Sequence, residues 1–526
     1  MRHVSIYSLT ILVILSTSAY AQIPKKFQAS TSEITSSNLL TNVINDIVVQ
    51  GDTIWLATEQ GVSFSRRGSL AWVNLANTGT FDSKGISAIG IYGNTICAAT
   101  GYSTSLGDAS VATGGGLHIS TDHGMTWKYV SQPVDNGTVD TLWYGNNPIP
   151  ALAITVPQQN ITYDVAITSQ AIWTANWAGM LRKSTDNGAT WQRVILPPDD
   201  LDEIAPSMTL QFELSPVQKI YTVNGVKDTL RENNNHKLFA VYASNDSVLW
   251  VGTANGINKS TDGGISWKKF SHQNQSKPIS GNFVVAITEQ QWNGRSIIWA
   301  ATNNAVDPDE VKGVSFSDDG GETWKTALHG FFVHNIAWRD SIVYVATSNG
   351  VYRSDDFGIT WSKNGSIYDA ESLQRFVDEE IYCVGAAGDT VFVGGIEGLA
   401  YTIDSPSNPF GSEWHIIQTC EQIGLEDRTY AYPNPFSPDF NVARIHYSTQ
   451  KISATSNVEV SITLFNFAMQ PVRTILHNAS RNGGREYDEF WNGKDDRGNV
   501  VANGVYFYSV TLNNGDPIWG KIMVLR

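Results

Sequence analysis

The chain has 526 residues, which is too long for one ordinary domain, so at least two domains are expected. It carries 35 Lys and Arg against 50 Asp and Glu, a net charge of -15, and its positive residues form no concentrated stripe, which argues against nucleic acid as a partner. Charged residues make up 16 % and aromatic residues 11 %, a balance typical of a β-rich extracellular protein.

The first 21 residues have the features of a signal peptide. Arg2 is followed by an apolar run at 11–15, and Ala19-Tyr20-Ala21 fits a signal-peptidase site. No Cys follows that site, so a lipid anchor is not expected. No later apolar run approaches the roughly 20 residues that a membrane helix needs. We therefore expect an exported mature chain from Gln22, secreted or attached to the outer surface, without a transmembrane anchor.

Seven similar β-rich segments follow, each ending in small residues. Their central residues are Trp55, Cys97, Trp173, Trp250, Trp299, Tyr344 and Phe392. Each segment belongs to a unit of four short antiparallel strands separated by Gly, Asn and Asp turns. Seven such units predict a seven-bladed β-propeller over residues 22–427, because radial closure removes most exposed sheet edges. Either residues 27–40 or the segment from Glu413 could supply the outer strand of the last blade.

Five units end in the octet S-x-D-x-G-x-[TS]-W. The octets close at Trp127, Trp191, Trp267, Trp324 and Trp361. In such a turn the Asp accepts hydrogen bonds from turn N–H groups, the Gly takes a positive φ and the Trp folds back over the turn. We therefore predict structural roles for Asp122, Asp186, Asp262, Asp319 and Asp356. The first unit (SRRGSLAW, to Trp72) and the last (SPSNPFGSEW, to Trp414) keep the Ser and Trp but lose the Asp.

These octets resemble the Asp-box, or BNR, repeat of sialidase-like and related β-propellers, in five of the seven units. The octets lie between the third and fourth strands, which places them on one face of a propeller. The insertions at about 102–114, 131–163, 195–238 and 303–312 fall in the other connections, on the opposite face. Long loops on a rigid scaffold are where binding sites usually occur.

The inserted loops carry aromatic and acidic residues suited to sugar stacking or cation binding. As candidate ligand-binding residues we single out Trp143, Tyr144, Trp177, Asp307 and Asp309. Further loop acids are Asp108, Asp199, Asp200, Asp202, Glu203 and Glu310. No cofactor is predicted, and Ca²⁺ at the acidic loops is possible. The alternative is that these acids form solvated surface and that the tryptophans plug the propeller rim.

The Asp-box resemblance also suggests a sialidase, which would need an arginine cluster, a Tyr nucleophile with a Glu partner and an acid/base carboxyl group. The early strands offer only Arg66 and Arg67, while Arg182 and Arg353 precede octets and are expected to point toward the octet side. Xyloglucan-degrading glycosidases with Asp boxes use two propellers, and this chain has room for one. We favour a non-catalytic module that binds a glycan or a protein, with a secreted glycoside hydrolase, sialidase-like or polysaccharide-degrading, as the alternative.

The three cysteines are widely spaced, without the close pairs of a zinc or redox motif. Cys97 and Cys383 lie in strand patterns and are expected to be buried free thiols. A bridge between Cys383 and Cys420 is the alternative.

After Cys420 a different all-β pattern begins at 428. Alternating runs give six or seven strands in under a hundred residues, which predicts an immunoglobulin-like β-sandwich over 428–526. Three prolines, Pro433, Pro435 and Pro438, mark its start.

This segment resembles the immunoglobulin-like domain of the flagellar-hook-capping family and the C-terminal sorting domain of type IX secretion cargo. The motifs are YPNPF (Tyr432, Pro433, Asn434, Pro435 and Phe436), GNVVANGVYFYSV at 498–510 and GKIMVLR at 520–526. The resemblance implies an address that the outer-membrane translocon reads. A flagellar role is the weaker alternative, since hook-capping proteins lack a propeller and a cleaved signal.

Overall fold

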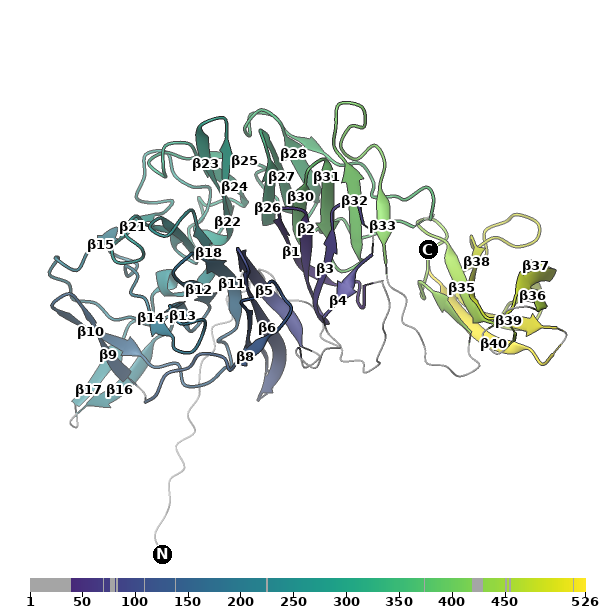
Figure 1. Cartoon of the computed structure of the whole chain (residues 1–526), viewed down its shortest axis with the longest axis horizontal. Coiled ribbons are helices and arrows are strands. Elements are labelled where there is room, and N and C mark those ends of the chain that lie inside the picture. Colours follow the sequence, from purple (N-terminus) through teal and green to yellow (C-terminus); the bar gives the residue numbers. More distant parts are fainter. Residues whose placement is uncertain are drawn as a thin grey trace, which may run out of the picture.

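The structure is a computed structural model that describes residues 39–526 apart from 70, 76–80, 82–83, 108, 138, 224–225, 373, 419–428, 450–451, 454–455 and 514. The predicted signal peptide, Asp108 and Cys420 lie outside the described residues. The described chain is all-β, as predicted, with one short 3-10 helix, η2 (Asn234–His236). A β-propeller comes first and a β-sandwich follows it (Figure 1).

Within the described ranges, seven antiparallel sheets make up the propeller. Each sheet uses four strands in chain order, and the fourth sheet gains a fifth outer strand from an insertion. The first three sheets contain β1 (Ile44–Gln50), β2 (Thr53–Thr58), β3 (Gly61–Arg66) and β4 (Val73–Asn74); β5 (Gly85–Tyr92), β6 (Thr95–Leu106), β7 (Ala109–Ser120) and β8 (Lys128–Val130); and β11 (Thr162–Ile167), β12 (Ile172–Asn176), β13 (Met180–Ser184) and β14 (Gln192–Arg193).

The other four sheets complete the ring. They contain β18 (Leu238–Ala243), β19 (Leu249–Thr253), β20 (Gly256–Ser260), β21 (Trp267–Phe270) and the added β15 (Glu203–Ile204); β22 (Phe283–Trp292), β23 (Arg295–Asn303), β24 (Gly313–Ser317) and β25 (Lys325–Ala327); β26 (Val333–Arg339), β27 (Ile342–Thr347), β28 (Gly350–Ser354) and β29 (Ser362–Lys363); and β30 (Cys383–Ala387), β31 (Thr390–Gly394), β32 (Leu399–Ile403) and β33 (His415–Ile417).

The first strand of each sheet contacts the first strand of the next, and β1 contacts β30 to close the circle. The outer strand of the last sheet, β33, comes from the segment that begins at Glu413, and the alternative at 27–40 lies outside the described residues up to residue 38. At the junction the Ile44 N–H donates to the Gly395 carbonyl oxygen at 3.0 Å. The ring therefore closes by contact between two complete sheets.

Large side chains of the second strands fill the space between neighbouring sheets. Trp55, Trp173, Trp250 and Trp299 are at most 2 % exposed. Each lies against the octet glycine of the next sheet: a Cβ on Gly264 would lie 2.7 Å from the Trp173 ring, and one on Gly358 2.9 Å from the Trp299 ring. The tryptophan of the preceding blade therefore packs directly on the octet glycine, and any larger residue at this position would clash with the tryptophan ring.

Two hairpins leave the ring between sheets. The first consists of β9 (Val139–Tyr144) and β10 (Asn147–Leu152), and the second of β16 (Lys219–Val223) and β17 (Val226–Leu230). Strands β6 and β7 also extend past their sheet as a two-stranded ribbon. Cys97 and Cys383 are buried free thiols, and burial raises the pKa of Cys97 to about 12.

The sandwich packs two sheets face to face. One has the order β34 (Tyr430–Tyr432), β35 (Ala443–Ser448) and β38 (Glu486–Trp491), and the other β37 (Pro471–Asn482), β36 (Asn457–Phe465), β39 (Gly504–Leu512) and β40 (Ile518–Val524). Alternate residues of β36 and β39 face inward, such as Ile462 and Tyr508, both 0 % exposed. They join one core of their own around Trp491.

Candidate functional site

The five octets share one hydrogen-bond pattern. In each, the Ser hydroxyl donates to the Asp carboxylate at 2.7–2.8 Å, and the Gly N–H donates to that Ser oxygen at 2.8–2.9 Å. The Thr or Ser before the Trp donates its N–H to the same carboxylate at 2.8–2.9 Å. Hydrogen bonds led by that of Thr126 lower the pKa of Asp122 to about 2. The hydrogen-bonding capacity of these carboxylates is therefore used within their own turns.

The last unit has an expanded octet, which the sequence did not reveal. We expected its Asp to be missing, but Thr402 occupies the Ser position and Asp404 the Asp position two residues later. The Gly411 N–H donates to the Thr402 hydroxyl at 3.3 Å, and Trp414 is buried like Trp267 and Trp324. Residues 405–410 stand between Asp404 and Gly411, where the other octets have a single residue, and in this wider turn Asp404 points to the sixth sheet instead of its own turn. There it accepts from Arg353 Nε at 2.7 Å and from the Tyr344 hydroxyl.

Tyr344, Asp404, Arg353 and Arg339 form a cluster whose residue types match part of a sialidase site. Arg339 donates to the backbone oxygens of Asp404 and Gly388, each at 3.0 Å. Tyr344 is 0 % exposed, and burial raises the pKa of its hydroxyl well above its usual range. A buried, protonated Tyr that donates to a carboxylate stabilises the seam between the sixth and seventh sheets and is not presented to a substrate.

The predicted loop residues do not form one group. Trp143 is 70 % exposed on β9, whereas its neighbour Tyr144 is buried and donates its hydroxyl to the Ile265 carbonyl oxygen at 2.6 Å. Ile265 belongs to the octet of the fourth sheet. The hairpin β9–β10 therefore crosses to the octet face, whereas the connection pattern had placed it with the other insertions on the opposite face.

Trp177, Asp307 and Asp309 lie elsewhere. Trp177 is partly buried and packs with two core clusters, with Lys237 Nζ 5.8 Å from its ring centroid. Asp307 accepts from the Asp309 N–H at 2.9 Å and from Gln273 Nε2 at 3.1 Å, and these hydrogen bonds lower its pKa. These contacts are all within the protein and serve its packing and hydrogen bonding.

Two of the other loop acids, Asp199 and Glu310, also have structural partners. Asp199 accepts from the N–H groups of Asn234 and Asn235 at 2.9 and 2.7 Å and so caps η2. Glu310 is buried and accepts from the N–H groups of Asn282 and Ala305 at 3.0 and 2.6 Å. Among the described residues, no group of three or more His, Cys, Asp or Glu side chains is placed to hold a metal ion.

The insertion at 195–238 forms a strap on the rim of the fourth sheet. Its strand β15 pairs with β21, and Asn147 of the hairpin holds the next part of the strap by donating to the Met208 carbonyl oxygen at 2.8 Å and accepting from the Leu210 N–H at 2.9 Å. Between the strap and the octet turns of the fourth and fifth sheets lies a cavity of about 340 Å³. We call it the rim cavity. Residues Glu203, Met208, Lys259, Thr261, Lys268 and Glu322 contribute to its wall.

Arg182 points away from the octet, contrary to our expectation. Its side chain is 3 % exposed, pairs with Asp135 at 3.0 Å and donates from Nε to the Gly179 carbonyl oxygen at 3.2 Å. Arg193 joins the same carboxylate at 3.5 Å. No ion pair in the described part of the chain brings a third arginine to Asp135. Gly179 lies in the turn between β12 and β13, at the end of β13 away from the octet, so Arg182 reaches the opposite face.

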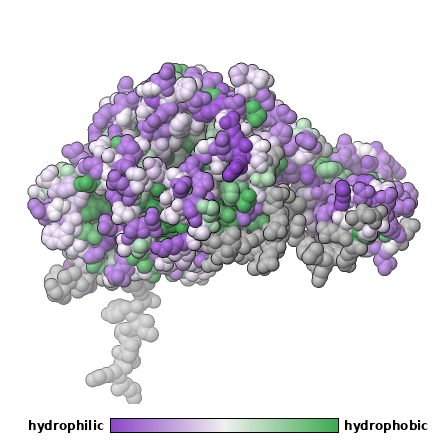
Figure 2. All heavy atoms as spheres, in the orientation of Figure 1, coloured by the Kyte–Doolittle hydropathy of each residue, from purple (hydrophilic) through white to green (hydrophobic). Residues whose placement is uncertain are grey.

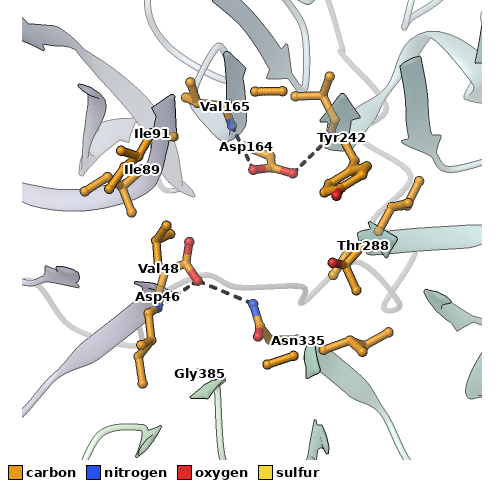
Figure 3. Close-up of a pocket in the computed structure, with 18 of the residues that line it drawn as sticks. Asp46, Val48, Ile89, Ile91, Asp164, Val165, Tyr242, Thr288, Asn335 and Gly385 are labelled. Atoms are coloured by element: carbon orange, nitrogen blue, oxygen red, sulfur yellow. Dashed lines mark hydrogen bonds between the residues drawn. The ribbon is translucent and has the colours of Figure 1, made fainter. Parts of the chain in front are cut away.

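A central channel of about 470 Å³ runs between the seven first strands. Figure 3 shows the Asp46 and Asp164 carboxyl groups pointing into it from different sheets. Asp164 accepts from the N–H groups of Val165 and Val241 at 2.8 and 2.9 Å, and so links the third sheet to the fourth. Asp46 accepts from Asn335 Nδ2 at 3.4 Å and so links the first sheet to the sixth (Figure 3). The seventh sheet lies between them and lines the channel with Val384, Gly385 and Ala386.

Both channel carboxyl groups have raised pKa values. Burial raises the pKa of Asp46 to about 6, and burial together with the charge of Asp46 raises that of Asp164 to about 7. Two carboxyl groups facing one channel are the residue types that acid/base chemistry on glycosides uses.

The YPNPF motif lies along the edge of the last strand. Asn434 Oδ1 accepts from the Met523 N–H at 2.8 Å, and Asn434 Nδ2 donates to the Lys521 carbonyl oxygen at 2.9 Å. The Phe436 N–H donates to the Met523 carbonyl oxygen at 2.9 Å, and the Phe436 ring is 2 % exposed in the sandwich core. Two motifs at opposite ends of the segment, YPNPF and GKIMVLR, are thus one structural unit.

Sequence comparison identifies one repeat. A family model described as BNR/Asp-box repeat matches residues 352–363, the sixth-sheet octet with its flanking strands. No curated protein matches the chain. In the described chain no helix is long and apolar enough to span a membrane.

Several solved structures resemble the chain. YCF48 from Cyanidioschyzon merolae is 15 % identical over 70 % of this chain and 97 % of its own, with a TM-score of 0.40. BamB from Moraxella catarrhalis is 10 % identical over 70 % and 98 %, with a TM-score of 0.36. PorZ of Porphyromonas gingivalis, a surface component of the type IX secretion system, is 12 % identical over 93 % and 87 %, with a TM-score of 0.21.

Proposed function

We propose that this chain is an exported β-propeller that binds a glycan or a protein ligand outside the cell or on its surface. The observation that carries the proposal is the rim cavity. Two insertions from neighbouring connections, the hairpin β9–β10 and the strap with β15, meet at the fourth sheet and are held there by Tyr144 and Asn147. A rigid ring with a cavity between its strands and an inserted segment is a typical setting for ligand binding.

We propose further that the terminal sandwich is the address for type IX secretion. Its support is the motif set and the finding that YPNPF and the last strand form one surface on a domain with its own core. The test is to delete residues 428–526 and to follow the propeller in periplasmic, surface and medium fractions. We expect the truncated chain to stay in the periplasm, while export past the outer membrane without the sandwich would refute the sorting role.

A glycoside hydrolase is the second candidate, and the channel carboxyl groups favour it. Asp46 and Asp164 are two carboxyl groups with raised pKa values in one channel, although Asp164 uses both oxygens to bind backbone N–H groups. Hydrolysis of fluorogenic glycosides, run with and without Ca²⁺ on the mature chain and on Asp164→Asn, decides the matter. Turnover that Asp164→Asn abolishes would establish the hydrolase, whereas no turnover by either protein removes it.

A further inference from the structure

The outer face of the larger sandwich sheet carries apolar side chains where a surface strand ordinarily has polar ones. Alternate residues of β39 and β40 face the core, and the residues between them face outward. In the sheet register Val505 lies opposite Met523, and Phe507 lies opposite both Phe465 and Lys521. Because opposed residues of antiparallel strands project on the same side, these side chains share the outward face.

The outward aromatic rings lie close to one another. The ring centroids of Phe465 and Trp519 are 5.4 Å apart, and those of Phe467 and Phe507 are 6.2 Å apart. Phe467 is 79 % exposed and Trp519 is 47 % exposed. We call this surface the aromatic face, and it consists of Phe465, Phe467, Val505, Phe507, Trp519 and Met523.

Two of the three motifs that resemble a sorting domain contribute to this face. Val505 and Phe507 belong to GNVVANGVYFYSV, and Met523 belongs to GKIMVLR. The third motif, YPNPF, covers the free edge of β40. There the Phe436 N–H donates to the Met523 carbonyl oxygen at 2.9 Å, and the Met523 N–H donates to Asn434 Oδ1 at 2.8 Å. A partner strand therefore cannot pair with this part of β40, and the aromatic face is the surface that the motifs leave accessible.

The aromatic face is turned away from the propeller. The other sandwich sheet contacts the propeller, where Arg444 Nη2 donates to the Ser372 carbonyl oxygen at 2.6 Å. Figure 1 shows β36 and β37 farther from the propeller than β35 and β38. Contiguous apolar surface that a folded chain leaves exposed is characteristic of interaction sites. The aromatic face is therefore open to a partner outside this chain.

We propose that the aromatic face is the surface by which the outer-membrane translocon recognises the sandwich, through a protein surface that is itself apolar. This inference rests on the sorting role proposed above and names its contact surface. The exposed fractions give the face about 400–500 Å² of apolar area, if a whole large side chain exposes about 150–250 Å². A stable dimer needs about 800 Å² from each partner, so two copies joined through this face alone would dissociate, whereas a transient contact during export needs less area.

The experiment follows export of the full-length chain that carries Trp519→Thr together with Met523→Thr, which keep good strand-forming residues at outward positions. The fraction found past the outer membrane is expected to fall at least about tenfold, with accumulation in the periplasm, because truncation of aromatic contacts commonly weakens an interface that much. The matched control is Phe440→Thr together with Phe490→Thr, which removes two rings of similar exposure from outside the aromatic face. It is expected to be exported like the wild type.

Calorimetry of each purified chain checks that the sandwich transition is unchanged, as expected for exposed residues. Phe467→Ser, at a turn outside the strands, is a second variant and is expected to reduce export in the same direction. Normal export of both face variants would overturn the proposal, and so would a wild-type dimer in light scattering that the substitutions dissociate. Export of the chain without residues 428–526 would instead refute the sorting role itself.

Discussion

At the scale of single residues, the octet glycine has two tasks. It takes a positive φ in its turn, and its missing side chain leaves space for the tryptophan of the preceding blade. The residue pattern of the octet predicted the first task. The second depends on which blade lies next to which, so it could only be seen in the assembled ring.

Gly264→Ala is expected to lower the free energy of unfolding by about 2–4 kcal/mol, because backbone strain at φ 85° adds to a clash with the Trp173 ring. Urea unfolding followed by tryptophan fluorescence measures the change. The control is Gly51→Ala, where φ is also positive but no atom lies within 4 Å of the new Cβ. It should cost only about 1–2 kcal/mol. Equal losses of unfolding free energy in the two variants would show that packing of Trp173 on Gly264 contributes nothing to stability.

The channel carboxyl groups and the octet carboxyl groups act on stability in opposite directions. For Asp46 and Asp164 the folded pKa lies above the unfolded value of about 3.8, so the folded state binds more protons and stability falls as pH rises from about 4 to 7. For the octets, with pKa values of about 2 at Asp122, Asp186 and Asp356, the stabilisation is present above about pH 4 and is lost as pH falls toward 2. These carboxyl groups together favour the folded state most near pH 4–5, whereas the buried His236, whose pKa burial lowers to about 4, disfavours it as pH falls below about 6.5.

Asp164→Asn tests the channel part of this profile. An amide cannot ionise, so the variant should lose less stability than the wild type between pH 5 and pH 8, by about 1–4 kcal/mol, since a pKa displaced by one is worth about 1.4 kcal/mol. Denaturant unfolding at several pH values provides the comparison. Parallel profiles for the two proteins would mean that Asp164 does not titrate in this range.

At the scale of elements, the hairpin β9–β10 and the strap depend on each other. Asn147 is buried and makes hydrogen bonds to Tyr144, Met208 and Leu210, all within or between these two segments. Their meeting point was not predictable, because a connection pattern gives the face from which an insertion starts but not the path it takes around the rim.

Asn147→Ala is expected to release the strap while the ring stays folded. Hydrogen exchange over residues 205–210 should become at least tenfold faster, since three hydrogen bonds of about 1 kcal/mol each are lost. Mass spectrometry of that segment measures the rate. Asn146→Ala, an exposed neighbour, is the control. Unchanged exchange in Asn147→Ala would indicate that the strap is held by its pairing with β21 alone.

The sandwich depends on Phe436, which anchors YPNPF against Trp491 with ring centroids 5.3 Å apart. Phe436→Ala should destabilise the sandwich by about 3–5 kcal/mol, because a fully buried aromatic ring is removed. Phe440→Ala removes a ring that is 49 % exposed and should change stability by less than about 0.5 kcal/mol. Calorimetry of the full chain resolves the sandwich transition. A Phe436→Ala transition at the wild-type temperature would contradict the assigned core.

At the scale of the whole molecule, the sequence predicted the architecture better than the sites. Repeated strands and octets were sufficient for an all-β propeller followed by a sandwich, because each unit has local signals of its own. The visible face of the molecule is mostly hydrophilic, with separate hydrophobic patches (Figure 2), in keeping with the low content of charged but high content of polar residues.

What the sequence did not predict depends on contacts between distant segments. Thr402 and Asp404 were missed as octet residues because an insertion separates them from Gly411 and Trp414. Asp46 and Asp164 were missed because they meet only when the ring closes and buries them in one channel. In both cases the residue types carry no special signal in the sequence, and their roles depend on contacts that form only when the ring is assembled.

The most direct test of the central claim, an exported propeller that binds its ligand without converting it, is a binding screen of the mature chain on glycan and peptide arrays, with and without Ca²⁺. The same preparation is assayed for turnover of every ligand that binds. We expect retention of a ligand that is recovered unchanged and is released when the strap is freed by Asn147→Ala. Recovery of a cleaved ligand would contradict the claim and move the function to the carboxyl groups of the central channel.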